Sequence, residues 1–534
     1  MKRNSKILTN RSKTNFNLPL ASTVAAVVIS LLVPQVTWAN ELRVIGVSDY
    51  DHISDLTFGN DDATYLATKL LNQDWKVSSH YNEEATQDKF NKAGDDDLLY
   101  FTGHGSSNGS LALQKYKKQN KPEGSYANWD TIGTSWFDKD IELAIFAACD
   151  VLQRNSWGEV LGGGAHHILG YRGLSSEGQD KAIIATFLKK VTAGNPVKVI
   201  DAWRFANVEY NEFDWAITGH KKNEDDYFWV EDGMTTDVTG TKDIYHWYNG
   251  GGYYLDVKSL TNERKTSNLI EGLRLKTESL DVQTIAKSLL DVNEKTLRGI
   301  NNKEPYYFSN EKGNLISYPS GAINYFRNMS NDGMHSSNEK VIKVAEKFIS
   351  EHGGFPKDAQ LNSVIPQIEV DANTKKEKVI GYLVQYSREH NNVPVEGYAG
   401  DSIKLIIDAK GVTYYFRLWR EIDESSSSKL SSELITNEEA VEKGLDALKH
   451  QVKGSNDDIK ITNSELVYFS HPFFTQQSDL NLAWKVSSGS VHTYIDALTG
   501  NVLNQDEIVD ETFEEIDLLE ERKIDFLPDE EELS

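Results

Sequence analysis

The chain has 534 residues, of which 39% are hydrophobic and 10% are aromatic. This length and apolar content predict two to four domains with packed cores and argue against wholesale disorder. The net charge of −25 argues against nucleic acid and anionic membrane as partners, because an acidic chain repels both.

The first 39 residues have the pattern of an export signal. The apolar run LPLASTVAAVVISLLV and the small-x-small sequence Thr37-Trp38-Ala39 follow a basic start that contains Lys2, Arg3, Lys6, Arg11 and Lys13. We expect cleavage after Ala39 and a protein that is secreted or held at the cell surface. The alternative is an uncleaved membrane anchor, since the apolar run approaches the length that spans a bilayer.

Residues 40–260 are expected to form an α/β domain with a parallel sheet, because strand-like and helical patterns alternate there. Strands are predicted over 42–47, 75–81, 97–103, 143–148, 167–171 and 214–220. Helices are predicted over 61–71, from Ser156, over 180–194 and over 196–210.

The rest of the chain has a different pattern. Residues 261–302 are predicted to form a helical linker. A helix followed by antiparallel strands is then predicted twice, in α+β modules over 303–425 and 426–505, as a weak internal repeat. Residues 506–534 contain 14 acidic residues against Arg522 and Lys523, which predicts a solvated tail or, as the alternative, a segment that binds elsewhere on the chain.

Two of the predicted strands end in residues with catalytic chemistry. YFTGHG places His104 after one strand, and AIFAACD places Cys149, the only cysteine, after another. Carboxyl ends of neighbouring parallel strands meet at one edge of a sheet, where an imidazole can take the proton of a thiol. Gly103 and Gly105 allow a sharp turn, and the N–H groups of Gly105 and Cys149 are predicted to form an oxyanion hole.

The two motifs together resemble the caspase-like cysteine peptidases, a group that includes legumains, gingipains, clostripain and caspases. The order of histidine before cysteine and their separation of 45 residues match that group. The resemblance implies a caspase-like fold over about residues 41–255, a thiol protease that hydrolyses peptide bonds with a His104–Cys149 dyad, and a protein or peptide substrate. The chain departs from the pattern at Asp150 and Val151, where the group often has glycine or serine.

The pocket that would select the substrate side chain is predicted among residues that follow two other strands. The candidates are Asp49, Asp51 and His52 after the first strand, and Tyr171 and Arg172 after the later one. An arginine in the pocket would favour acidic side chains, and an aspartate would favour basic ones.

The C-terminal half resembles PepSY-like modules, which occur in propeptides of secreted bacterial peptidases. WKVSSGSVHTYIDALTGNVL is similar to their strand-turn-strand ending, and LIIDAKGVTYYF is a looser version in the first module. This resemblance implies an inhibitory or chaperone-like regulatory region within the same chain.

No cofactor and no catalytic metal are expected. A structural calcium ion at Asp95-Asp96-Asp97 or Asp225-Asp226 is a further prediction, because calcium prefers clustered carboxylates. Two other functions use the same residues differently. In one, a non-catalytic secreted binding protein keeps the caspase-like scaffold, with Cys149 as a core thiol and His104 as a turn residue. In the other, a transpeptidase or ligase uses the same dyad.

Overall fold

The computed structural model describes residues 40–115, 124–154, 157–228, 234–250, 253–254, 270–276, 280–292, 305–423, 425, 428–429, 433–453 and 459–503. The predicted export signal and the acidic tail lie outside these described residues. No helix in the described part of the chain combines the length and the hydropathy that a bilayer crossing needs.

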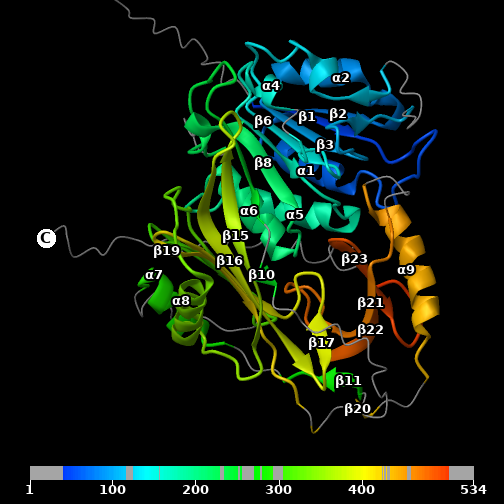
Figure 1. The fold of residues 1–534 in the computed structure, drawn as a ribbon, viewed down its shortest axis with the longest axis vertical. Helices are drawn as coiled ribbons and strands as arrows, with labels where there is room; N and C mark the ends of the chain where they lie inside the picture. Colours follow the sequence, from blue (N-terminus) through cyan, green and yellow to red (C-terminus); the bar gives the residue numbers. More distant parts are fainter. Residues whose placement is uncertain are drawn as a thin grey trace, which may run out of the picture. The chain divides into compact units, whose positions relative to one another are not determined.

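A mixed sheet begins with five parallel strands, as the sequence predicted. β1 (Glu41–Gly46) lies between β2 (Lys76–Tyr81) and β3 (Leu98–Thr102), and β3 pairs with β6 (Leu143–Ala147), which pairs with β7 (His167–Tyr171). This α/β arrangement, parallel at one end, is consistent with the expected caspase-like fold (Figure 1).

The next strand, β8 (Trp215–His220), runs antiparallel to β7, which differs from the parallel sheet expected for this domain. Two helices, α5 (Glu177–Val191) and α6 (Val199–Glu209), connect these strands. After one connecting helix, the chain is back at the edge of the sheet where the previous strand began, so the next strand is parallel. After two connecting helices, the chain is at the edge where the previous strand ended, so the next strand is antiparallel. β8 therefore has to run back across the sheet.

The sheet continues beyond this domain without a break. β9 (Ile244–Asn249) pairs with β8 and with β15 (Gln360–Asp371), both antiparallel. From β15 the antiparallel order is β16 (Glu377–His390), β18 (Ser402–Asp408), β19 (Gly411–Leu418), β14 (Ile323–Phe326), β13 (Gly313–Ser317) and β12 (Tyr306–Asn310). The short β10 (Tyr253–Tyr254) also pairs with β15.

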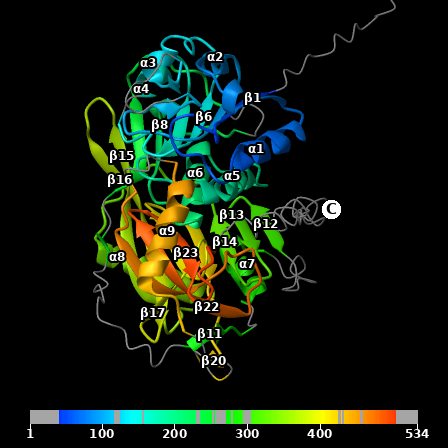
Figure 2. The same ribbon diagram turned by 90° about the vertical axis from the view of Figure 1, so that its right-hand side faces the viewer.

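Helices cover both faces of the parallel strands, because successive side chains alternate between two cores. Leu98 and Tyr100 belong to one core, which also contains side chains of α1 (Asp61–Leu71), α5 and α6. Leu99 and Phe101 belong to the other core, on the face of the smaller helices. The second face carries α2 (Gln87–Lys92), α3 (Trp129–Ile132), α4 (Gly158–Leu161) and the strand pair β4 (Leu111–Ala112) and β5 (Tyr126–Ala127). Figure 2 shows α2, α3 and α4 on one side of β6 and β8, with α5 and α6 on the other.

A second sheet forms near the C-terminus. It contains β17 (Val393–Glu396), β21 (Asn463–Phe469), β22 (Asp479–Ser488), β23 (Val491–Asp496), β11 (Ile270–Arg274) and β20 (Ser428–Lys429). α8 (Asn338–Glu351) contacts β16, β18 and β19, while α9 (Asn437–Gln451) contacts β21, β22 and β23. A helix contacting antiparallel strands therefore occurs twice, at α8 and at α9, while the two predicted modules and their PepSY-like resemblance stay predictions. The predicted linker contains α7 (Val282–Leu290) but also the strand β11.

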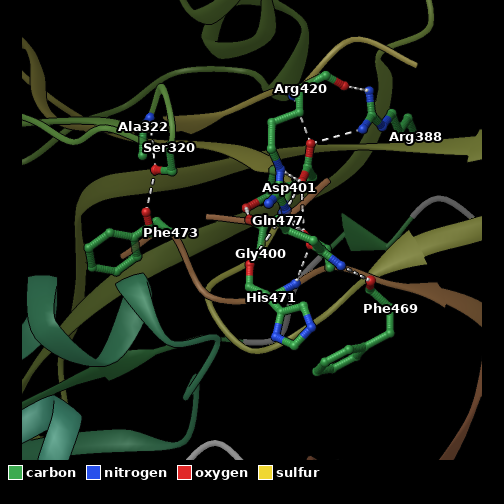
Figure 3. A network of polar contacts seen from close by, with 12 residues as sticks. Ser320, Ala322, Arg388, Gly400, Asp401, Arg420, Phe469, His471, Phe473 and Gln477 are labelled. Atoms are coloured by element: carbon green, nitrogen blue, oxygen red, sulfur yellow. Dashed lines mark hydrogen bonds and ion pairs between the residues drawn. The ribbon is translucent and has the colours of Figure 1, made fainter. Parts of the chain in front are cut away.

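A buried ion network joins the two sheets around Asp401 (Figure 3). One carboxylate oxygen accepts from Arg388 at 2.9 Å, and the other accepts from Arg420 Nε and from Ser470, each at 2.8 Å. Burial alone would raise the pKa of Asp401, but Arg420 and Arg388 outweigh it and lower the pKa. The network therefore stabilises the fold at neutral pH, and its contribution is lost as pH falls below the ordinary aspartate pKa and through the lowered pKa of the folded state.

Replacing Asp401 with alanine should lower the free energy of unfolding by roughly 3–5 kcal/mol, because it leaves two guanidinium groups buried without their carboxylate. Urea unfolding followed by circular dichroism measures this loss. Glu346→Ala, an exposed position on α8, is the control and should change the value by less than about 0.5 kcal/mol. Equal losses in the two variants would contradict the assigned role.

Candidate active site

His104 lies just beyond β3 at the carboxyl edge of the parallel strands and is 4% exposed. Its backbone N–H donates to the Tyr50 hydroxyl at 2.8 Å, and the two rings lie 4.9 Å apart. The ring atom Nε2 lies 2.9 Å from the carbonyl oxygen of Ser54. Because a carbonyl only accepts, this contact places the proton on Nε2 and the lone pair on Nδ1. Nδ1 is buried and has no direct hydrogen bond among the described residues, although the Lys453 carbonyl lies close enough to the ring to act on its pKa.

Cys149 occupies the matching position beyond the neighbouring strand. The last residues of β3 and β6, Thr102 and Ala147, are paired, and His104 and Cys149 each follow two residues later. The backbone N–H of Ser175 donates to the Cys149 sulfur at 3.1 Å. The thiol is fully buried in a cluster with Leu174 and with four side chains of the C-terminal module: Leu448, Val452, Ile459 and Val491.

The turns beside both residues need special backbone conformations. A Cβ atom on Gly105 would meet the carbonyl oxygen of Cys149 at 2.3 Å, so only glycine fits there. Asp150 adopts a left-handed conformation with φ of 58°, at a position where the caspase-like group often has glycine or serine. Aspartate is one of the few other residues that tolerates this conformation, so the departure is compatible with the same turn.

An extended segment of the C-terminal module crosses this edge of the sheet. α9 ends just before Val452, which is extended and forms an antiparallel bridge with Ser176. The N–H of Lys453 donates to the carbonyl of Ser175 at 3.4 Å, and the N–H of Gly105 donates to the carbonyl of Lys453 at 3.0 Å. A backbone carbonyl therefore occupies the position predicted for an oxyanion. Figure 2 shows the upper end of α9 next to α5 and α6.

The side chain of Lys453 enters a buried acidic pocket under this segment. Its Nζ atom lies 2.5 Å from an oxygen of Asp180 and 3.3 Å from an oxygen of Asp62, and it also donates to the Thr102 hydroxyl. The Lys453 side chain is 0% exposed. Asp62 lies in the first turn of α1, Asp180 lies in α5, and Thr102 ends β3, so three elements build the pocket.

Two tyrosines fix the carboxylates of the pocket. The Tyr100 hydroxyl donates to Asp62 at 2.8 Å, and the Tyr171 hydroxyl donates to Asp180 at 3.3 Å. A third acid, Glu177 of α5, is also buried. Lys453 thus contacts two acidic side chains directly, and Glu177 is a third buried acid that acts on its charge.

The electrostatics of the pocket follow from burial and from Lys453. Burial alone would lower the pKa of Lys453, but Asp180, Asp62 and Glu177 outweigh it and raise the pKa, so the ammonium stays charged. Burial raises the pKa of Asp180 to about 6 and that of Glu177 to about 8, although Lys453 acts against both shifts.

The His104–Cys149 pair is neutral as it stands. Burial raises the pKa of the Cys149 thiol. Burial also lowers the pKa of His104, while the carbonyl groups of Ser54 and Lys453 act against this shift. These shifts favour a protonated thiol at Cys149 and an uncharged imidazole at His104.

Only one of the candidate pocket residues lies at this pocket. Tyr171 contacts Asp180 directly, whereas the Arg172 guanidinium stacks 3.7 Å from the ring centre of Tyr248. Asp49, Asp51 and His52 are exposed in the loop after β1. The backbone N–H of Asp51 donates to the carbonyl of Gln114, and that of Asp49 donates to Asn82.

Sequence reasoning missed the acids of the pocket and the lysine that fills it. Asp62 and Asp180 stand on the apolar faces of their helices, in register with Leu66 and Ile184, and a charge at such a position signals a special environment. Lys453 lies 391 residues from Asp62 along the chain and carries no comparable signal.

The described residues contain no group of three or more His, Cys, Asp or Glu side chains arranged to hold a metal ion. The acids proposed for calcium have other partners: Asp95 contacts Lys139, Asp96 contacts Arg43, and Asp226 contacts His166. The calcium site stays a prediction.

Comparisons with known proteins match only part of the chain. A family model described as a domain of unknown function (DUF6345) matches residues 47–251, less than half of the chain. This stretch contains His104 and Cys149 and ends before the C-terminal modules. A comparison with curated proteins found no match.

A solved structure titled "structure of pro-sf-caspase-1" is similar to part of the chain. The two are 13% identical, and the similarity covers 38% of this chain and 90% of that chain with a TM-score of 0.24. At this TM-score the likeness carries no argument about activity.

The thiol of Cys149 should react slowly with iodoacetamide in the native chain, because burial raises its pKa and the C-terminal module covers it. We expect a rate at neutral pH about 100-fold or more below that of the chain unfolded in urea. The native rate should continue to rise with pH above the ordinary cysteine pKa, since the thiolate forms later. Intact mass against time measures both rates, and equal rates would show that the thiol is exposed.

Proposed function

We propose that the protein is a cysteine endopeptidase that uses His104 and Cys149 as its dyad. The observation that carries this proposal is the hydrogen bond from the Gly105 N–H to the carbonyl of an extended segment lying beside Cys149. A peptidase site would receive an extended substrate through a carbonyl held at this N–H, which supports the proposal. The placement of both side chains at the ends of paired parallel strands supports the same reading.

In the proposed reaction, His104 takes the Cys149 proton through Nδ1, because Nε2–H is held by Ser54. The thiolate attacks the substrate carbonyl, and the Gly105 N–H stabilises the oxyanion. The amine leaves with the proton from His104, which leaves a thioester on Cys149. Water then attacks the thioester, releases the carboxylate product and restores the thiol. A transpeptidase would follow the same path with an amine in place of water.

A non-catalytic binding protein is the second candidate, and the buried, protonated thiol favours it. A core cysteine needs no base, yet the buried imidazole of His104 lies at the same edge. Covalent labelling separates the two functions.

A library of peptidyl acyloxymethyl ketones should label Cys149 in a Val452→Asp variant of the full chain. Val452 is buried over the thiol, and a carboxylate there would open the cover because its burial is unfavourable. In the same background, Cys149→Ala should abolish the adduct, and His104→Ala should slow it by about 100- to 10,000-fold. Intact mass and peptide mapping measure the adduct.

His335→Ala is the matched control, because His335 is exposed, and it should label at the unchanged rate. If no peptide labels the Val452→Asp chain while circular dichroism shows that it is folded, the peptidase proposal is wrong and the binding protein is favoured.

A further inference from the structure

We propose that the pocket beside Cys149 selects a lysine side chain of the substrate, and that the chain's own Lys453 fills this pocket and inhibits the enzyme. This inference rests on the proposed peptidase function and adds to it the substrate class and the mode of regulation. The C-terminal module then acts as an inhibitor that is part of the same chain.

The backbone of the segment lies as a substrate would. Val452 and Lys453 run antiparallel to Ser175 and Ser176, and this adds a short strand next to the nucleophile. The carbonyl of Lys453 faces the Gly105 N–H, so Lys453 has the position of the residue whose peptide bond would be attacked. The carbonyl of His450 is also held, by the N–H and the hydroxyl of Thr57 at 3.1 and 3.0 Å.

The side chain of the same residue identifies the chemistry that the pocket accepts. The ammonium of Lys453 lies at the bottom of the pocket between Asp180 and Asp62, with Glu177 in the same acidic cluster. An acidic substrate side chain would meet only like charges there, and an apolar one would leave buried carboxylates without a cation. A long side chain with a terminal cation satisfies both conditions, as Lys453 does.

A simple structural ion pair does not account for the whole arrangement. Such a pair requires the Nζ contacts alone, whereas here the N–H, the carbonyl and the side chain of one residue all meet partners at the edge that carries His104 and Cys149. Because Leu448 and Val452 also pack over the thiol, an external peptide reaches Cys149 only after this segment leaves. Tethering to the same chain gives the segment an effective concentration on the order of millimolar, which favours the blocked state.

The test compares the full chain with its Lys453→Ala variant, using three acyloxymethyl ketone peptides that differ only in lysine, aspartate or leucine next to the reactive group. We expect Lys453→Ala to raise the labelling rate with the lysine reagent by at least about tenfold, since the blocked fraction falls. The labelling rates with the aspartate and leucine reagents should rise far less. Lys460→Ala, an exposed lysine beyond the same segment, is the control and should leave all rates unchanged.

The differences among the three labelling rates distinguish release of Lys453 from its pocket from a general loosening of the C-terminal module. A variant that merely loosens the C-terminal module would expose Cys149 to all three reagents equally, and that result would overturn the inference. A peptide with the sequence LKHQVK should slow lysine labelling of Lys453→Ala, whereas LKHQVA should not. Equal effects of the two peptides would also count against the inference.

The acids of the pocket provide a second measurement. In the Lys453→Ala background, Asp180→Asn should lower kcat/KM for a lysine substrate by about 10- to 100-fold, mainly through KM, because a charge-assisted contact is lost. Asp61→Asn, at an exposed neighbour of Asp62, should have little effect. An unchanged preference for lysine in Asp180→Asn would show that the pocket does not select the side chain.

The outcomes separate this inference from the function on which it rests. If Cys149 is labelled in a His104-dependent way but prefers aspartate or leucine, the peptidase proposal stands and the lysine pocket is wrong. If none of the three reagents labels any variant, including Val452→Asp, both are wrong.

Discussion

Three acidic side chains are buried in one pocket of the N-terminal domain. The contact between the two halves of the molecule depends on them. Asp62, Glu177 and Asp180 are each no more than 5% exposed, and such charges are unfavourable unless a cation compensates them. The described residues place Lys453 in that role, and it comes from the opposite end of the chain. The N-terminal domain therefore keeps its acids buried only with help from the C-terminal module.

The buried acids also make the stability of the fold depend on pH. A buried acid whose pKa is raised in the folded state favours folding at low pH and opposes it as pH rises, because the native state holds the proton more tightly. Asp180 at about 6 and Glu177 at about 8 fall in this class even with Lys453 in place. The free-energy cost of burying these acids is therefore lowest when they are protonated or when a cation fills the pocket.

Much of the N-terminal fold could be predicted from the sequence, because its signals are local. The buried strands β3 and β6 are short runs with apolar residues on both faces, and the residues after them locate His104 and Cys149 at one edge. The reversal of β8 was missed, since it depends on how two helices traverse one face rather than on any local pattern. Pairing of β9 with β15 was missed for a similar reason: strand partners more than 100 residues apart leave no periodicity to read.

The same difference between local and long-range signals explains which parts of the candidate site could be predicted from the sequence. His104 and Cys149 could be predicted because each lies next to a strong strand signal, whereas the acidic pocket is formed by side chains of α1, α5 and the segment after α9. Tyr171 was found because it ends β7, whereas its partner Asp180 was only the first residue of a predicted helix. Arg172 was an equal candidate by position, but its stacking on Tyr248 depends on β9, which only the folded chain brings there.

The continuity of the sheet across β9 and β15 has a consequence for any attempt to divide the molecule. A chain cut near residue 260 would lose the partner of β9, whose sequence IYHWYN is rich in aromatic and β-branched residues. An open strand edge of this composition is a template for pairing with other chains. A fragment that ends there would therefore have a tendency to self-associate, because β15 would no longer cover that edge.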